Sequence, residues 1–277
     1  MLEISIILII YKSENIIKTF LEKVPKKLPV IIVDNSKSFQ LKEDIENKYS
    51  NVNVFLRENN GVSNALNFGV SKIKTKYFLQ ISPDIRFNFD DLKIFLDLAK
   101  KLNDKFCAIG PRFTNVNEKS HRQINKNKNY DEIDSIHGSC MFINKNCFEK
   151  IGGFDSNFFL YFEETEYCFR AKQKGFATYQ VNSSQVMTTG RSVENISKDK
   201  SFSNILIWHF IWSKYYFNKL KYGKLICLII FLPVLIRTFL KFTFYKIIRN
   251  KNKFEKYKFR LSGLINSILE KKSSLRP

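Results

Sequence analysis

The sequence predicts an α/β domain with a mainly parallel sheet, followed by a basic, aromatic and helical C-terminal extension. Short apolar stretches rich in β-branched residues alternate with helical patterns over residues 4–81. The stretch at 4–11 is almost continuously apolar, as in a strand that is buried on both faces. Residues 193–277 carry 18 Lys and Arg but only 4 Asp and Glu, so the basic excess lies at the end of the chain.

The expected elements follow one another in regular order. The strands are expected at 4–11, 30–33, 52–56, 77–81, 139–143 and 176–181. The helices are expected at 13–24 with Ser13 as N-cap, 39–49, 62–73, 90–102, 147–151 and 163–174. Gly152-Gly153 and Gly175 end the last two helices, and the Asn- and Lys-rich stretch 114–134 is expected to be a loop.

Composition narrows the class of protein. The chain has 277 residues, 44% of them hydrophobic, which suffices for a sizeable core. Its five cysteines form no CxxC pair and accompany no His cluster, which argues against a zinc site and indicates a reduced, cytoplasmic compartment. The acidic start at Met1-Leu2-Glu3 is not that of a signal peptide.

The C-terminal extension is expected to contact a membrane surface. Leu225–Ile236 lacks charge for 12 residues, whereas a transmembrane helix needs about 20. Arg237 and Lys241 then interrupt the apolar stretch, so an interfacial helix or hairpin with a Trp/Tyr and Lys/Arg rim is favoured. A spanning or re-entrant helix and an ordinary helical subdomain are the alternatives. The basic, aromatic composition also suggests nucleic acid, but without a recognition motif we expect no nucleic-acid partner.

Two aspartates follow expected strands. Asp34 follows the strand at 30–33, and Asp84 follows the strand at 77–81. Ligands bind at the carboxyl ends of parallel strands, and we expect these two strand ends to be neighbours. Carboxylates there would suit Mg²⁺ or Mn²⁺ bound to a diphosphate, although an isolated Asp often closes an Asx-turn instead. The absence of a glycine-rich phosphate loop argues against a P-loop kinase or a Rossmann oxidoreductase.

A third acidic group follows the aromatic stretch 158–162. Glu163, Glu164 and Glu166 fall in the first turn of an expected helix. The helix dipole alone favours such residues there. The functional interpretation is a general base beside an apolar wall, whose pKa desolvation raises toward the working pH.

These segments together resemble glycosyltransferase family 2, and within it the rhamnosyltransferase-like enzymes of cell-surface polysaccharide assembly. The resemblance covers residues 3–195. Its matching segments are ISIILIIYKSE at the start, IIVDNS at 31–36, ENNGVSNALNFGV at 58–70, ISPDIRF at 81–87, and HGSCMFINKNCFEKIGGFDSNFFLYFEETEYCFRAKQKGF at 137–176.

The resemblance implies a GT-A fold over residues 1–195, with residues 196–277 as a membrane-associating extension. It implies inverting transfer of rhamnose, or another hexose or deoxysugar, from a nucleotide-diphosphate sugar to a lipid-linked or growing glycan. The enzyme would lie on the cytoplasmic face of the membrane. Glu164 corresponds to the family's catalytic base. The donor-binding positions are Tyr11, Asp34, Asn60, Gly61, Asn64, Ser82, Asp84 and Arg191, with Asp84 also binding a divalent cation. The acceptor-side positions are His137, Gly153, Phe154, Asp155 and Glu163.

The chain departs from the family pattern at several positions. Ser82 replaces an Asn, and Glu164 and Glu166 replace aspartates. The stretch 186–192 lacks the His that often binds metal in the family, so the alternatives are weaker metal binding or direct neutralisation of diphosphate charge by Arg191. A catalytically degenerate paralogue that binds nucleotide-sugar or glycan is therefore the alternative function.

Overall fold

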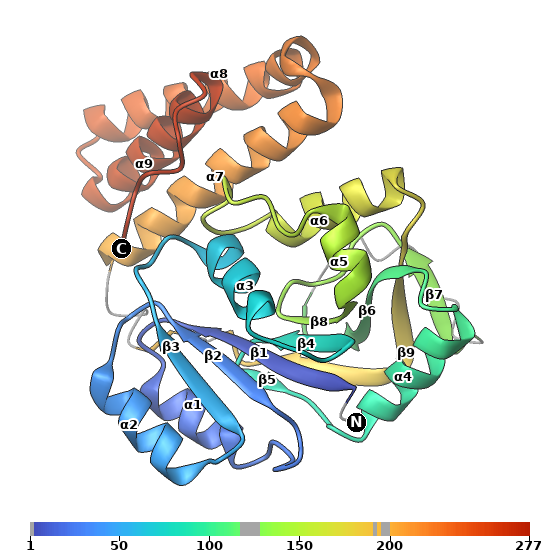
Figure 1. Ribbon diagram of the computed structural model, residues 1–277. Helices are drawn as coiled ribbons and strands as arrows, with labels where there is room; N and C mark the ends of the chain where they lie inside the picture. Colours follow the sequence, from blue (N-terminus) through green and yellow to red (C-terminus); the bar gives the residue numbers. More distant parts are fainter. Residues whose placement is uncertain (1–2, 117–127, 191–192, 195–199) are drawn as a thin grey trace. The chain divides into compact units, whose positions relative to one another are not determined.

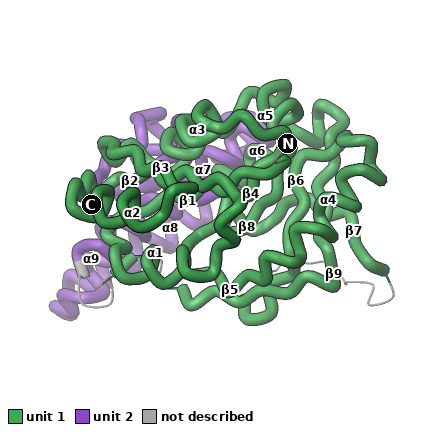
Figure 2. The backbone as a smooth tube through the Cα atoms, turned by 60° about the horizontal axis from the view of Figure 1, so that its bottom comes forward, with its two compact units in different colours: residues 1–155, 163–194 green, residues 156–162, 195–277 purple. Residues whose placement is uncertain are grey.

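The computed structural model describes residues 3–116, 128–190, 193–194 and 200–277, so Arg191 lies outside the described residues. The chain divides into two compact units (Figure 2). Unit 1 comprises residues 1–155 and 163–194, and unit 2 comprises residues 156–162 and 195–277.

Unit 1 contains a nine-stranded sheet in the order β3-β2-β1-β4-β8-β6-β9-β5, with β7 paired to β9 (Figure 1). The first four strands are parallel neighbours, as the sequence predicts. They are β1 (Ile4–Ile10), β2 (Val30–Asp34), β3 (Val52–Leu56) and β4 (Tyr77–Ile81).

The other half of the sheet is mixed. β8 (Cys140–Asn144) is antiparallel to both β4 and β6 (Phe106–Phe113), and β9 (Ala177–Thr188) is parallel to β6. The short β5 (Ile85–Arg86) pairs with the end of β9. The sequence did not predict β5 or β6. The expected loop at 114–134 is wrong in part, because β7 (Tyr130–Ile133) forms an edge strand on β9.

Helices cover both faces of the sheet (Figure 1). Alternate residues of β1 point to opposite faces, with Ile6 and Leu8 in one core and Ile7 in the other. The first core also takes in α1 (Glu14–Leu21), α2 (Phe39–Lys48) and α4 (Asp91–Lys101). The second takes in α3 (Val62–Ser71), α5 (Lys145–Ile151) and α6 (Glu163–Gln173).

Unit 2 is built around three packed helices, α7 (Lys200–Tyr222), α8 (Lys224–Ile247) and α9 (Lys251–Ile268). Its core contains Ile211, Tyr215, Cys227, Phe231 and Leu264. A Cβ at Gly263 would lie 2.6 Å from the carbonyl oxygen of Trp208, so only glycine allows α9 to approach α7 this closely.

Two expectations for the extension need correction. Trp208 and Trp212 do not form an exposed rim, because they are buried and their indole N–H groups donate to Ser262 and to the Lys271 carbonyl. The helix is not confined to the 12 uncharged residues either, because α8 continues through Pro233 and Arg237 for 24 residues. Among the described residues, α8 is the one helix long and apolar enough to cross a membrane.

Glu194 caps α1 from 179 residues away in the sequence. Its carboxylate accepts the backbone N–H groups of Asn15 at 2.7 Å and Ile16 at 3.1 Å. Ser13, the expected cap, makes no side-chain capping bond, and its hydroxyl donates to the Tyr11 carbonyl instead. The carboxylate therefore satisfies free amides at the positive end of the helix and ties the chain beyond β9 to the end of β1.

We expect Glu194→Ala to lower the free energy of unfolding by about 1 kcal/mol, because two amides of α1 lose their acceptor. Urea denaturation of the purified chain measures this loss. The control is Glu22→Ala, whose exposed carboxylate lies 3.7 Å from Lys48 and should contribute little. Equal stability of the two variants would contradict the capping role.

Candidate active site

Asp34 is the last residue of β2 and lies beside Ile10, the last residue of β1. Its side chain is fully buried, and its carboxylate accepts the backbone N–H groups of Ser36 at 2.7 Å and Ser38 at 2.8 Å. Asp34 thus shapes the loop that begins α2. This is the turn-closing role that the sequence left open, and its proposed contact with a nucleotide stays a prediction.

Asp84 lies in the turn after β4, where the Ile85 N–H donates to the Ser82 carbonyl at 3.1 Å. Its Oδ2 accepts the Thr188 hydroxyl at 2.6 Å and the Gly190 N–H at 3.1 Å. Oδ1 accepts no hydrogen bond from any residue that the structure describes. One carboxylate oxygen of Asp84 is therefore held by the chain at the end of β9.

The expectation that Asp34 and Asp84 lie on neighbouring strands is wrong, because β1 separates β2 from β4. At about 4.8 Å per strand, the two strand ends are roughly 10 Å apart. The continuation of β1 lies at this strand end too, and the Lys12 N–H donates to the Ser36 hydroxyl at 2.6 Å. Tyr11 precedes this contact. From β1 the sheet is extended to one side by β2 and to the other side by β4. Open α/β sheets bind ligands at the strand ends where the order of strands reverses in this way.

The described residues contain no group of three His, Cys, Asp or Glu side chains that could hold a metal ion. Thr188, which donates to Asp84, comes from the stretch 186–192 where the sequence lacks the family histidine. A single carboxylate oxygen still suits Mg²⁺ or Mn²⁺ when diphosphate oxygens and water complete the coordination. The described residues therefore fit a cation whose ligands come mostly from a bound diphosphate. They do not supply a complete set of protein ligands.

The segment before α3 has a glycine-dependent turn. Gly61 has φ 94° and starts the helix, and the Asn64 side chain donates to the Asn60 carbonyl at 2.9 Å. These contacts account for the Asn60, Gly61 and Asn64 pattern structurally. Arg57 stacks on Phe68, with its guanidinium carbon 4.1 Å from the ring centroid.

Asn67 of α3 clamps the turn after α5. Its side-chain oxygen accepts the Phe154 N–H at 3.0 Å, and its side-chain nitrogen donates to the Phe154 carbonyl at 2.8 Å. A Cβ on Gly153 would lie 2.9 Å from the Asn67 oxygen, and Gly153 has φ 68°. The predicted acceptor-side residues Gly153 and Phe154 thus build the scaffold, since the Phe154 ring is buried against Phe148.

Arg170 joins the same turn to α6. Its guanidinium holds both carboxylate oxygens of Glu166 and donates to the carbonyls of Ile151 at 2.9 Å and Gly153 at 2.6 Å. Glu166 is buried, and this desolvation raises its pKa against the opposing effect of Arg170. Asp155 follows the turn and acts electrostatically on both partners. Glu166 is therefore a structural anchor.

Glu164 lies over Gly138, at the start of β8. A Cβ on Gly138 would lie 3.3 Å from the Glu164 Cγ, so a larger residue would press on this side chain. The Thr165 hydroxyl donates to the Glu164 carboxylate at 3.0 Å. Ser139, which follows Gly138, accepts the Ser82 N–H with its backbone carbonyl at 2.8 Å. The structure therefore brings Glu164 to the strand next to the turn that holds Ser82 and Asp84.

Two further side chains support this strand end. Gln80 of β4 is buried and donates to the Gly138 carbonyl. His137 accepts the Ser139 N–H at 3.2 Å through Nδ1, and its ring lies 4.3 Å from that of Phe113. Sequence patterns gave no sign of Gln80, whose role depends on the pairing of β4 with β8.

Glu163 is the more deeply buried neighbour of Glu164. Its Oε2 has no hydrogen-bond partner in the described part of the chain. Burial, reinforced by the nearby Glu164 charge, raises the pKa of Glu163 to about 8. The sequence predicted a desolvated carboxyl beside an apolar wall at Glu164, and the structure places such a carboxyl at Glu163.

The aromatic stretch that was expected to form this wall belongs to unit 2. Phe158 packs on Tyr216, Phe159 on His209 and Phe162 on Phe217 of α7. Tyr161 and Phe162 have φ 69° and 67°, a left-handed conformation that costs about 1–3 kcal/mol per residue. The chain thus turns sharply just before Glu163. The sequence did not predict this turn, because neither of the two residues with positive φ is a glycine.

Comparison with known proteins places the chain among glycosyltransferases. Residues 5–164 match the family described as Glycosyl transferase family 2. The chain is 29% identical over 194 residues to the low-salt glycan biosynthesis hexosyltransferase Agl10 of Haloferax volcanii, covering 62% of each chain. It is 26% identical over 210 residues to rhamnosyltransferase WbbL of Escherichia coli, covering 64% of this chain and 79% of that protein. The chain thus matches less than two thirds of the length of the first relative.

Solved structures share the fold. GalNAc-T7 with UDP, GalNAc and Mn²⁺ matches with a TM-score of 0.57 at 16% identity, covering 78% of this chain and 49% of that one. S. aureus TarS 1–349 with UDP-GlcNAc matches with a TM-score of 0.56 at 12% identity, covering 98% and 93%. The expected fold is confirmed. With its strand-end carboxylates and a family match over more than half its length, the chain belongs to glycosyltransferase family 2.

Proposed function

We propose that the protein is an inverting glycosyltransferase that moves a sugar from a nucleotide-diphosphate donor to a lipid-linked or growing glycan. Family membership and relatives named as hexosyltransferase and rhamnosyltransferase support the transfer. Both structural neighbours hold UDP or a UDP-sugar, which supports the donor class. Rhamnose, or another hexose or deoxysugar, is the proposed sugar.

The observation that carries the proposal is the position of Glu164. It packs on Gly138, next to Ser139, whose carbonyl accepts the Ser82 N–H at the start of the Asp84 turn. A donor whose diphosphate lies at Asp84 would therefore present its sugar toward the segment on which Glu164 packs. A carboxylate beside that sugar suits the general base that inversion requires.

The proposed reaction is a single displacement. Glu164 takes the proton of the acceptor hydroxyl while the hydroxyl oxygen attacks the anomeric carbon. The bond from that carbon to the diphosphate breaks in line with the attack, and the nucleoside diphosphate leaves with the electron pair. Glu164 ends protonated, and the anomeric configuration is inverted.

Asp84 is the residue that would hold a divalent cation, through Oδ1, while Thr188 and Gly190 fix its other oxygen. The bound cation would neutralise the charge that develops on the departing diphosphate. Asp34, Asn60 and Tyr11 are the proposed contacts to the nucleoside.

A second candidate is a catalytically degenerate paralogue that binds the donor without transferring its sugar. The Thr188–Asp84 contact favours this candidate, because it uses one oxygen of the expected metal ligand in a protein hydrogen bond. Donor binding without turnover would distinguish it from the transferase.

The proposed site of action is the cytoplasmic face of the membrane, where a lipid-linked acceptor would be presented. The extension at residues 196–277 is the proposed membrane-associating part, and its basic excess supports contact with anionic lipid.

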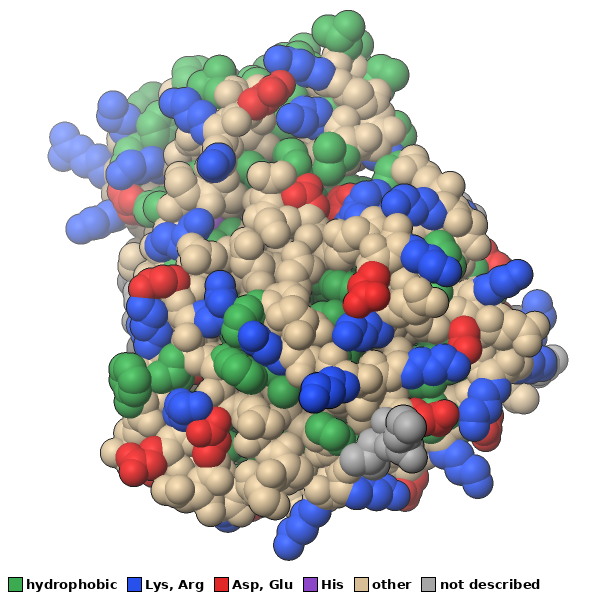
Figure 3. Space-filling view, in the orientation of Figure 1, with side chains coloured by type: hydrophobic (Ala, Val, Ile, Leu, Met, Phe, Trp, Pro, Cys, Tyr) green, Lys and Arg blue, Asp and Glu red, His purple; other side chains and the backbone are tan. Residues whose placement is uncertain are grey.

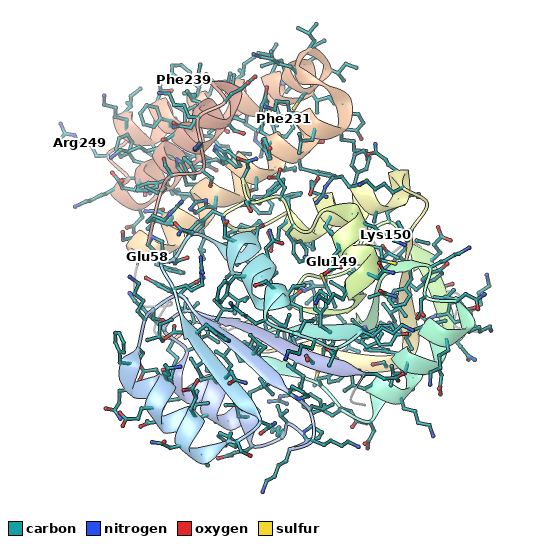
Figure 4. All side chains as sticks on the ribbon, viewed as in Figure 1. Glu58, Glu149, Lys150, Phe231, Phe239 and Arg249 are labelled. Carbon is teal, nitrogen blue, oxygen red and sulfur yellow. The ribbon has the colours of Figure 1, made fainter. Side chains whose placement is uncertain are left out.

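We expect Glu164→Gln to lower kcat by about 10²–10⁴-fold with little change in donor affinity, because only proton removal is lost. Transfer of labelled sugar and donor calorimetry measure the two effects. The control is Glu149→Gln, at an exposed glutamate of α5 (Figure 4). Full activity in Glu164→Gln would refute the base assignment.

We expect Asp84→Asn to remove the Mn²⁺-dependent part of donor binding, since the neutral amide is a poor ligand for a hard cation. Calorimetry with and without Mn²⁺ measures this difference, and the exposed Asp97→Asn provides the control. Unchanged metal dependence would count against a role for Asp84 in cation binding.

The raised pKa of Glu163 predicts a pH-dependent stability. Between pH 4.5, the ordinary pKa of a glutamate, and about pH 8, the Glu163 side chain keeps a proton in the folded state that it has released in the unfolded state. The free energy of unfolding should therefore fall as pH rises through this range. Melting temperatures at pH 5–8.5 should decline less steeply in Glu163→Gln than in the unmodified chain or in Glu149→Gln, and parallel slopes would disprove the assignment.

A further inference from the structure

One face of α8 is apolar and has no partner among the described residues. Leu225, Ile229 and Ile247 are 77%, 73% and 77% exposed. They belong to a row of residues three, four or seven positions apart, all on one side of the helix. We call this row the α8 stripe: Leu225, Ile229, Leu232, Ile236, Leu240 and Ile247. Exposed apolar surface of this extent marks a contact site.

The opposite face of α8 is committed to unit 2. Cys227, Phe231 and Thr238 are buried there, and Phe231 packs against Tyr215 of α7 with ring centroids 5.1 Å apart. Figure 4 labels Phe231 together with Phe239, which is 52% exposed. The packed face therefore fixes which residues of α8 point outward.

Positive charge surrounds the stripe, and α8 contains no acidic residue. Arg237 lies beside the stripe, and Lys246 and Arg249 lie at its end. Helix α9 adds four exposed cations, Lys251, Lys253, Lys256 and Lys258. Figure 3 shows apolar and basic side chains together over these helices. An apolar strip with a basic border complements a bilayer that carries anionic headgroups.

We propose that the α8 stripe docks on an anionic lipid bilayer with α8 lying in the plane of the membrane. The stripe enters the headgroup and upper acyl region, and Arg237 extends its guanidinium to lipid phosphates. This inference rests on the membrane association in the proposed function, and it specifies which face of α8 contacts the bilayer and how the helix is oriented.

The packing of α8 on α9 argues against a transmembrane orientation of the intact unit. Two stacked ring pairs join the helices, Phe242 with Phe254 at 5.1 Å and Tyr245 with Tyr257 at 5.4 Å. Lys241 donates to the Tyr257 hydroxyl at 3.2 Å. A spanning α8 would draw the cations of α9 into the hydrocarbon or break this interface, and both changes are costly. In the plane of the membrane, α9 packs on the side of α8 away from the stripe, so its cations stay outside the hydrocarbon.

Vesicle flotation of the full chain tests the proposal without requiring transfer activity. Vesicles of phosphatidylcholine alone are compared with vesicles containing about a third phosphatidylglycerol, at low and high salt. The stripe variant is Ile229→Gln/Ile236→Gln/Leu240→Gln. The matched control is Phe39→Gln/Ile94→Gln, which removes exposed apolar side chains from unit 1. Circular dichroism and donor-induced thermal shift report whether each variant is folded.

We expect the unmodified chain and the control to float with the anionic vesicles and the stripe variant to lose roughly a hundredfold or more in partitioning. Salt should weaken binding, and alkaline carbonate should release the bound chain. Retention after carbonate, with protease protection on the far side, would establish a span and overturn the proposal. Failure to bind vesicles would also overturn it, as would a dimer that the stripe substitutions convert to monomer. Each of these three results would leave the donor-binding test of the proposed function unaffected.

Discussion

The candidate site depends on the Arg170 guanidinium. It binds Glu166 through both carboxylate oxygens and reaches the carbonyls of Ile151 and Gly153. These bonds connect α6 to the end of α5, and Asn67 connects the same turn to α3. The first turn of α6, with Glu163 and Glu164, is positioned by this network. A lysine could supply the charge but not the planar set of donors.

The order of the strands then decides which side chains meet. Because β1 lies between β2 and β4, Asp34 and Asp84 follow strands on opposite sides of β1. β8 pairs with β4 on the far side, and Gly138, against which the Glu164 side chain packs, lies two residues before β8. Nucleoside, diphosphate and sugar contacts would follow one another along the strand ends in this order, which makes the arrangement suitable for an extended donor.

Periodicity and family pattern predicted the parallel strands and all six helices of unit 1, because each of these is determined by its own sequence. The missed strands depend on partners instead. Gly110-Pro111-Arg112 interrupts the apolar pattern of β6, and the polar edge strand β7 is recognisable only through its pairing with β9. The distance between Asp34 and Asp84 and the Thr188 contact likewise follow from strand order. Arg237 suggested an end to the apolar stretch, but α8 continues because that side chain lies on its exposed side.

The central claim is that a nucleotide-diphosphate sugar binds along these strand ends and reacts at Glu164. The most direct measurement is a thermal-shift screen of uridine-, thymidine- and guanosine-diphosphate sugars with Mn²⁺, followed by NMR of the anomeric proton in any transfer product. We expect one nucleotide class to raise the melting temperature and the product to have the inverted configuration. No stabilisation by any donor, or a product with retained configuration, would contradict this claim.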